Sequence, residues 1–330
     1  MQAILAVTFP FFALVLLGYL AVQRGYLPES AIPGLNGFVL FFALPCMLFR
    51  FGSSMPFAQL IDPVLIAIWG GSAALMVLFT VALTLRRAPE APGVSMKDAA
   101  FGALVAAFPN SGFMGFPLMI GLLGEKVAGP LIGCILIDIV FTSSLCLALA
   151  QLRPASETAT QHGVLAPFGR ALRGAVSNPL PWAIALGALV AATGLPQPGP
   201  FKDIVRMLGD AATPVALFTI GAVLARSQVQ AQTRAQSGAA GLGDVGVITL
   251  VKLLVHPLLV WALGWLAVRA GGLTPATVTS LVLTAALPAA GNVSLLAERF
   301  GADNGRVARI ILWSTALAFF SFSAVVALRS

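Results

Sequence analysis

The chain has 330 residues, and its 19 Lys and Arg plus 12 Asp and Glu make only 9% of them charged. Ordinary soluble domains carry roughly 25% charged residues. With 58% hydrophobic residues and a mean hydropathy of +0.95, a soluble fold would expose larger apolar patches than soluble monomers tolerate. The composition therefore excludes a soluble enzyme, a disordered chain and a nucleic-acid-binding protein, and it predicts a polytopic membrane protein.

The chain length then predicts the number of membrane helices. A helix needs about 20 residues to cross a bilayer, so roughly ten helices with short loops fill the chain. The first apolar run is not expected to be a cleavable signal peptide, because its first positive charge, Arg24, follows the run. The ten apolar runs lie at about 3–23, 31–51, 61–85, 98–124, 127–151, 177–194, 203–225, 245–268, 275–299 and 306–328.

Loop charges predict the orientation of these helices, because Lys and Arg accumulate in cytoplasmic loops. If the N-terminus lies outside, 12 basic residues, Arg306 among them, fall in cytoplasmic loops and 6 fall on the opposite side. We therefore expect both termini outside and the polar segment 153–176 in the cytoplasm. The same bias accounts for the net charge of +7 without a nucleic-acid partner.

The two halves of the chain match each other at two prolines. Aligning Pro45 with Pro214 sets ALPCMLF against ATPVALF, and aligning Pro109 with Pro288 sets AAFP against AALP. Each half holds five predicted helices, and this odd number means that the second half enters the membrane upside down. The sequence thus predicts an all-α protein with a 5+5 inverted repeat, a common plan of secondary transporters. Its parts are a first repeat (1–152), a cytoplasmic linker (153–176) and a second repeat (177–330).

Helix-breaking residues concentrate in the middle of the fourth and ninth predicted helices, which read AFPNSGFMGFP from residue 107 and PAAGNVS from residue 288. Irregular backbone at the bilayer midplane is tolerated only where it is buried in protein or lines a cavity. A helix that restarts there points free N–H groups at the midplane and attracts anions. The alternative is two proline kinks that only shape packing. The candidate substrate-binding residues are Pro109, Asn110, Ser111, Gly112, Pro288, Gly291 and Asn292.

Four ionisable residues within the predicted helices are candidates for ion coupling or for support of the site. Asp138 lies near mid-depth, where a carboxylate is costly unless it is paired or protonated, which suits a proton carrier. Lys252 either serves a function or extends its stem to the cytoplasmic interface. Asp210 is compatible with an outer vestibule, and His256 is either a packed, hydrogen-bonded residue or a proton relay.

No catalytic or metal-binding pattern emerges from the rest of the chain. It has no GxSxG, no HExxH and no phosphate-binding loop. Its cysteines, Cys46, Cys134 and Cys146, lie in apolar runs without CxxC spacing and are expected to be packing residues. We therefore predict no enzyme, no metal site and no cofactor, while proton and sodium coupling both stay open.

Several motifs carry a family resemblance. FPNSGFMGFPLMIGLLG (108–124) resembles the fourth helix of the auxin efflux carrier family, where a Pro-Asn pair precedes a Met-Gly-x-Pro-Leu run. FALPCMLFRFG (42–52) resembles its second helix, AALPAAGNVSLLAERFGAD (285–303) its ninth, and VKLLVHPLL (251–259) the eighth helix of its bacterial branch. The short segment 153–176 is unlike the long regulatory loop of the plant members and favours the bacterial branch.

The resemblance implies a scaffold domain and a transport domain, each built from both repeats. It also implies that the fourth and ninth helices cross at Pro109 and Pro288 and that an organic anion binds beside this crossing. Asn110 would be the amide that contacts the anion, and Asn292 is its counterpart in the ninth helix. Bacterial relatives include carriers of malonate and similar carboxylates. We therefore expect a secondary transporter of a small organic anion in the bacterial inner membrane, working by elevator-like or rocking alternating access. An indole acetate efflux carrier and an anion-binding receptor or channel stay as alternatives, and a homodimer stays open.

Overall fold

The computed structural model describes residues 2–54, 62–87, 94–151, 179–235 and 242–329. These residues form helices and no β-strand, and six of the helical segments are long and apolar enough to cross a membrane. The prediction of an integral, all-helical membrane protein is confirmed. The six segments are Glu29–Ser54, Pro63–Arg86, Ala128–Ala150, Gly199–Arg226, Gly243–Arg269 and Asn304–Leu328, and the shorter apolar helices are Phe9–Gln23, Pro179–Thr193 and Pro275–Ala285.

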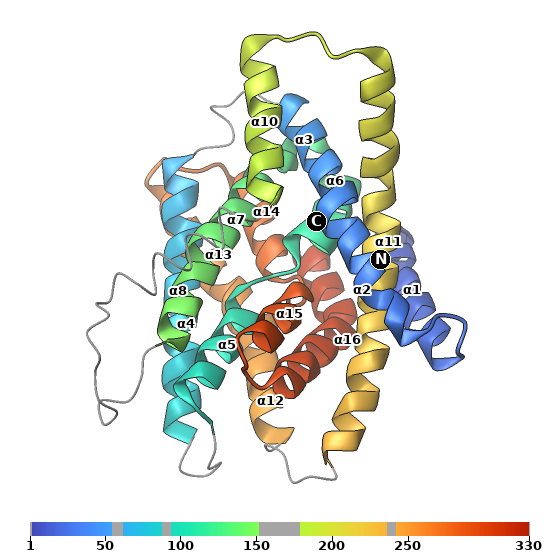
Figure 1. Cartoon of the computed structure of the whole chain (residues 1–330). Helices are drawn as coiled ribbons and strands as arrows, with labels where there is room; N and C mark the ends of the chain where they lie inside the picture. Colours follow the sequence, from blue (N-terminus) through green and yellow to red (C-terminus); the bar gives the residue numbers. More distant parts are fainter. Residues whose placement is uncertain (1, 55–61, 88–93, 152–178, 236–241, 330) are drawn as a thin grey trace, which may run out of the picture.

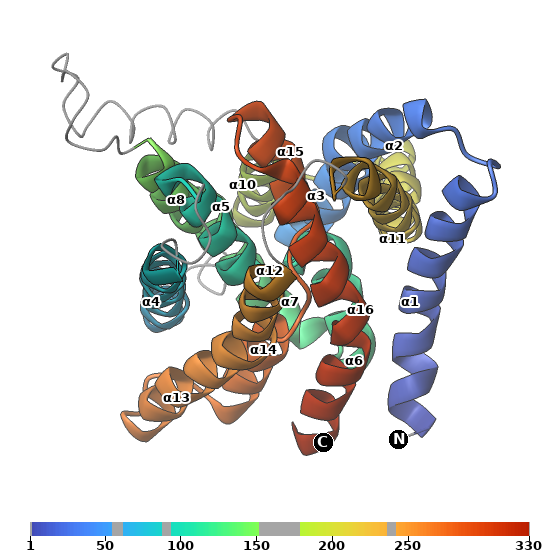
Figure 2. The same ribbon diagram turned by 90° about the horizontal axis from the view of Figure 1, so that it is seen from below.

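Two groups of helices pack closely, and α16 contacts both of them, since it lies against α1 and α11 as well as α12 and α15 (Figure 1). In the first group α1 lies along α11, and α3 packs against both α10 and α11. In the second group α4 packs on α5 and α13, α13 on α14, and α16 on α12 and α15. Figure 2 shows α1, α2 and α11 on one side of the molecule and α4 and α13 on the other. The main helices are α1 (Gln2–Gln23), α2 (Ile32–Phe38), α3 (Leu44–Ser54), α4 (Pro63–Arg87), α5 (Met96–Ala107), α6 (Phe116–Leu123), α7 (Ala128–Ile137), α8 (Ser143–Ala150), α10 (Pro179–Thr193), α11 (Gly199–Ala235), α12 (Leu242–Leu250), α13 (His256–Arg269), α14 (Pro275–Ala285), α15 (Asn292–Arg299) and α16 (Asn304–Arg329).

Short π-helical turns interrupt several of these helices, and proline explains three of them. The turns η2 (Val39–Ala43), η4 (Ser111–Gly115) and η7 (Val251–Val255) are each followed by one residue and then by proline. Proline has no N–H to donate and crowds the carbonyl four residues earlier, so the helix accommodates one extra residue in the turn before it. A fourth π turn, η6 (Asp138–Thr142), has no such proline. Two of these turns, η6 and η7, carry ionisable residues, and π turns recur at functional sites.

Two glycines allow α1 and α11 to approach closely. A Cβ atom on Gly221 would collide with the Val15 carbonyl oxygen, and one on Gly18 would collide with the Phe218 carbonyl oxygen. Only glycine therefore permits this backbone-to-backbone contact, the usual device for close helix packing in membranes.

Substituting Gly221 by leucine is expected to lower the melting temperature of the detergent-purified protein by several degrees. The added side chain separates α1 from α11, and overpacking of this kind costs about 1–3 kcal/mol. Scanning fluorimetry measures the shift. Gly71→Leu on α4 is the matched control, because a Cβ atom there meets no atom within 4 Å. Equal melting of the two variants would contradict the importance of the contact.

One buried arginine joins the starts of three helices. Arg306, in the first turn of α16, is 1% exposed; its Nε donates to Asp244 in the first turn of α12, and its Nη1 donates to the Asp98 carbonyl oxygen in α5 (2.7 Å). A Cβ atom on Gly102 would lie 2.8 Å from the same guanidinium. The prediction that Arg306 is a loop charge is wrong: neighbouring helix ends enclose it, which sequence alone does not show.

Candidate functional site

The helical segments α5–η4 and α14–α15 are each interrupted, and the two interruptions lie against each other. The α5 helix ends at Ala107 and η4 begins at Ser111, while α14 ends at Ala285 and α15 begins at Asn292. The Asn110 N–H donates to the Pro288 carbonyl oxygen (2.8 Å). The Ala290 N–H donates to the Phe108 carbonyl oxygen (3.1 Å). These bonds form an antiparallel bridge between Pro109 and Ala289, so the two irregular segments satisfy one another's backbone groups inside the protein.

Backbone groups at the C-terminal end of α14 that have no partner within the helix form hydrogen bonds with other helices. In a continuous helix the Ala285 carbonyl would accept from residue 289, but the Ala289 N–H donates to Ser314 Oγ (3.2 Å). The tighter bond from residue 288 is excluded because that residue is proline. Lys252 Nζ takes the vacant place and donates to the Ala285 carbonyl oxygen (3.1 Å).

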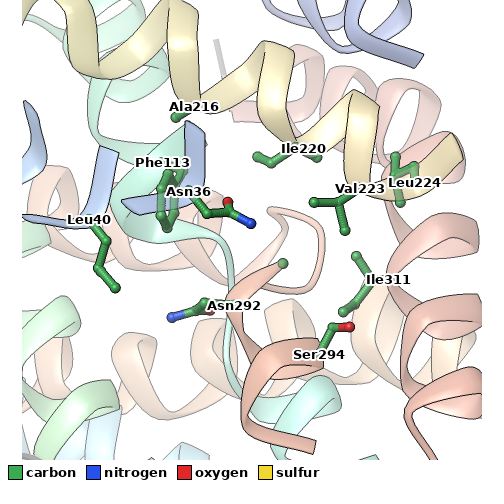
Figure 3. Close-up of a pocket in the computed structure, with 11 residues that line it drawn as sticks. Asn36, Leu40, Phe113, Ala216, Ile220, Val223, Leu224, Asn292, Ser294 and Ile311 are labelled. Carbon is green, nitrogen blue, oxygen red and sulfur yellow. The ribbon is translucent and has the colours of Figure 1, made fainter. Parts of the chain in front are cut away.

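A cavity lies beside this crossing (Figure 3). The amide of Asn36 reaches it from α2, and the amide of Asn292 lies on the opposite side at the start of α15. The remaining wall is mostly aliphatic, with the Ser294 hydroxyl as an additional polar group. Its lining residues are Asn36, Leu40, Phe113, Ala216, Ile220, Val223, Leu224, Gly291, Asn292, Ser294 and Ile311.

The predicted substrate-binding residues divide between this cavity and the crossing. Gly291 and Asn292 line the cavity. Asn110 and Ser111 are buried at the crossing, 3% and 2% exposed, together with Pro109 and Pro288, and the neighbouring Gly112 is partly buried. The Oδ1 atoms of Asn110 and Asn292 are both buried without a hydrogen-bond partner. Unpartnered buried polar atoms are costly, so both amides have capacity for a ligand or water.

Sequence reasoning missed Asn36 and Ser294. Asn36 lies in a short segment between Gly34 and Gly37 that has no internal match and carries no charge, so nothing in the sequence marks it as a binding residue. Ser294 was part of the ninth-helix motif, and its hydroxyl donates to Asn304 Oδ1 (2.6 Å).

Asp138, the first residue of η6, lies outside the cavity and is buried against α4. Its Oδ1 accepts hydrogen bonds from Trp69 Nε1 (3.0 Å) and from Thr142 Oγ1 (3.1 Å). Its Oδ2 is buried and has no partner. Asp138 is 0% exposed and Trp69 is 1% exposed, so the carboxyl group is removed from solvent.

Lys252, in η7, and His256, at the start of α13, are linked to this carboxyl group through Trp69. Lys252 is 0% exposed and its Nζ lies 3.0 Å from His256 Nδ1, to which the ammonium donates. The His256 ring is 5.6 Å from the Trp69 ring, centroid to centroid, and its Nε2 has no partner. In this structure Lys252 does not extend to an interface, and His256 is packed and hydrogen-bonded.

Asp210 has a different environment from the other three. Its carboxylate accepts from Arg50 Nη1 (2.7 Å), and the two side chains are 59% and 37% exposed. Neither residue lines the cavity. An exposed pair of this kind contributes about 0–1 kcal/mol, so Asp210 is a surface charge joining α11 to α3.

Among the described residues there is no group of three or more His, Cys, Asp or Glu side chains that could hold a metal ion. Cys134 and Cys146 are buried and Cys46 is partly buried, each as a free thiol. The site is therefore one of amides, hydroxyls and helix ends beside a buried acid and base.

Comparison with known proteins gives matches over nearly the whole chain. A family model described as "Membrane transport protein" matches residues 3–326. The "Putative malonate transporter" of Rhizobium meliloti (strain 1021) is 30% identical over 323 residues, which are 96% of this chain and 93% of that protein. The "Uncharacterized transporter YfdV" of Escherichia coli (strain K12) is 27% identical over 297 residues (88% and 86%). An "Uncharacterized transporter" of Methanothermobacter thermautotrophicus is 26% identical over 313 residues (93% and 92%).

Proposed function

The chain belongs to the auxin efflux carrier family of membrane transport proteins, and from that premise we propose that it is a secondary active transporter of small organic anions. The observation that carries the proposal is the cavity beside the crossing, which Asn36 and Asn292 both line and where α15 begins. The start of α15 is the positive end of a helix dipole and favours an anion, while the Val293 and Ser294 N–H groups donate to the Ala290 and Gly291 carbonyl oxygens. The wall offers hydrogen bonds and a helix end in place of a full positive charge.

Small carboxylates are the substrates that we favour. The cavity wall offers two amides and one hydroxyl, groups that hydrogen-bond a carboxylate. The relative named for malonate is consistent with this choice. Efflux of an indole acetate remains the alternative substrate assignment.

We further propose that the chain is a ten-helix 5+5 inverted repeat whose breaks lie in helices four and nine. Its first repeat is 1–152 and its second 177–330; the predicted cytoplasmic linker, 153–176, lies outside the described residues. Close glycine contacts support the repeat: Gly18 and Gly221 join α1 to α11, and Gly52 and Gly187 join α3 to α10. Gly187 follows Gly18 by 169 residues and Gly221 follows Gly52 by 169 residues, the same offset as from Pro45 to Pro214. Equivalent contacts thus recur with the halves exchanged.

The two packing groups supply the parts of an alternating-access mechanism. The group of α1, α2, α3, α10 and α11 is the proposed scaffold, and the group containing both interrupted helices is the proposed transport domain. Asn36 lies on the first and Asn292 on the second, so the cavity lies at their interface. Movement of the transport domain along the scaffold, elevator-like, would carry the anion across the bilayer. Both termini outside a bacterial inner membrane is the orientation that fits the loop charges.

Uptake of labelled malonate and labelled indole acetate into proteoliposomes tests the function. Saturable malonate uptake with counterflow at carrier turnover is the expected result. Conductance far above carrier turnover in planar bilayers would make the protein a channel, and binding without flux would make it a receptor.

The Asn110→Ala variant addresses the crossing itself. We expect at least a tenfold loss of malonate uptake, because the Asn110 amide is buried beside the bridge, its Nδ2 can donate to a carboxylate, and hydrogen bonds to charged groups are worth about 1.5–3 kcal/mol. Initial uptake rates at equal protein density measure the loss. Transport equal to wild type would remove Asn110 from the substrate site.

A further inference from the structure

We propose that Asp138 and Lys252 form a buried proton site, separate from the anion cavity, which is coupled to that cavity through the carbonyl group of Ala285. This inference rests on the proposed transport function and adds the ion that drives it. Neither residue lines the cavity.

The carboxyl group of Asp138 is incompletely satisfied. Two donors, Trp69 Nε1 and Thr142 Oγ1, converge on Oδ1, whereas Oδ2 is buried and unpartnered. None of the ion pairs among the described residues joins Asp138 to Lys252. A fully buried carboxylate without a contacting counter-ion is costly, and binding one proton at Oδ2 removes that cost.

A proton fits this place better than a metal ion. The Lys252 ammonium approaches from the neighbouring helix, connected to Asp138 through His256 and Trp69, and its charge repels a second cation. In the described part of the chain the other titratable groups on this site are His256 and the buried Cys134, one helical turn before Asp138. The α14 helix has no charged residue, and α4 has only Arg86 and Arg87 at its end.

The proton balance is simple. The Asp138 carboxylate takes one proton from water on one side of the membrane and becomes a neutral carboxylic acid; on the other side it returns that proton to water. No oxidant or other reactant is needed. Binding of the proton makes the net charge of the Asp138–Lys252 site more positive by one, which favours loading the anion together with the proton.

Lys252 provides the connection to the anion cavity. Its ammonium occupies the acceptor site that Pro288 and Ala289 leave vacant on the Ala285 carbonyl. Three residues later the Pro288 carbonyl accepts the Asn110 N–H, and six residues later Gly291 lines the cavity. A change in the charge of Asp138 shifts the ammonium between the carboxylate and this carbonyl. The displacement therefore reaches the backbone that shapes the cavity, which makes Lys252 a positioning residue.

Proteoliposomes loaded with a pH gradient test the proton site. For one proton per anion, wild-type protein should accumulate labelled malonate up to about tenfold per pH unit of inward acid gradient, with or without sodium. Asp138→Asn should retain counterflow at reduced rate but accumulate no malonate above the equilibrium ratio. Asp203→Asn, an exposed carboxylate paired with Arg206, is the matched control and should accumulate as wild type does. Gradient-driven accumulation in Asp138→Asn, or dependence on sodium, overturns the proposal.

Lys252 variants test the connection. Lys252→Arg keeps a cationic donor for the Ala285 carbonyl and should bind malonate within a few-fold of wild type, whereas Lys252→Met should bind it at least tenfold more weakly. Calorimetry in two buffers of different ionisation enthalpy gives the affinity and the number of protons taken up with malonate. Proton uptake should be present in wild type and Lys252→Arg and absent in Asp138→Asn. Equal affinity of the arginine and methionine variants overturns the connection.

A measurement without substrate separates failure of this inference from failure of the transport function. The melting temperature of purified wild-type protein should change with pH in a way that Asp138→Asn abolishes and Asp203→Asn preserves. If malonate is neither bound nor transported but this difference is present, the substrate assignment fails and the proton site stands. If the pH profiles of wild type and Asp138→Asn coincide, the proton site is wrong whatever the substrate.

Discussion

Replacing Asn292 by leucine is expected to reduce malonate uptake by about 10- to 100-fold while leaving the protein folded. The side chain keeps its approximate size but loses the amide that lines the cavity at the start of α15. A hydrogen bond to a charged ligand is worth about 1.5–3 kcal/mol, and each 1.4 kcal/mol is about a factor of ten in affinity. Initial rates over a range of malonate concentrations measure the effect, and melting curves confirm folding.

Two further variants bracket this result. Ser323→Ala removes a polar group from α16 outside the cavity, where the hydroxyl bonds only to its own helix at the Phe319 carbonyl (2.6 Å), and it should transport as wild type does. Asn36→Leu removes the amide on the opposite wall and should cause a smaller loss, because no helix terminus at the cavity reinforces it. If Asn292→Leu retains wild-type affinity and rate, the anion does not bind in this cavity.

The general class of this protein was predictable because it depends on quantities that sequence contains directly. A charge fraction of 9% and long apolar runs are properties of composition and order, so the membrane environment followed without any contact being known. The Pro-Asn motif at Pro109 likewise carried the family, which the match over residues 3–326 confirms. The roles of the predicted site residues stay predictions, since only Gly291 and Asn292 among them line the cavity.

What the sequence could not supply were the partners of those residues. Asp138 was recognisable as an unusual charge, but Trp69, which binds it from 69 positions earlier, has no motif that points to it. Asn36 is equally ordinary in its local sequence and reaches the cavity only because α2 packs against α11. Arg306 illustrates the opposite error, because its position near a helix start suggested solvent, whereas three helix ends surround it. Side-chain environment depends on which helices meet, and periodicity does not contain that information.

Replacing Arg306 by methionine is expected to destabilise the protein by about 3–5 kcal/mol, the usual cost of removing one partner of a buried ion pair. The variant leaves the Asp244 carboxylate, whose side chain is 15% exposed, without its counter-ion and removes the side-chain donor to the Asp98 carbonyl oxygen. Methionine fills much of the same volume, so the loss is electrostatic more than steric. The starts of α5, α12 and α16 should separate, and the yield of folded protein and its melting temperature should both fall.

The same substitution elsewhere in the chain is the control. Arg206→Met breaks an ion pair with Asp203 in which both side chains are more than 60% exposed, and exposed pairs contribute about 0–1 kcal/mol, so its melting temperature should stay close to that of wild type. The double variant Arg306→Met/Asp244→Leu should recover part of the lost stability, because it removes the unpaired carboxylate as well. Together with Asp244→Leu alone, these variants form a double-mutant cycle. A coupling energy between Arg306 and Asp244 in this cycle separates the effect of charge burial from that of lost packing. If the double variant is no more stable than Arg306→Met alone, packing around the guanidinium, and not its charge, holds the three helix ends together.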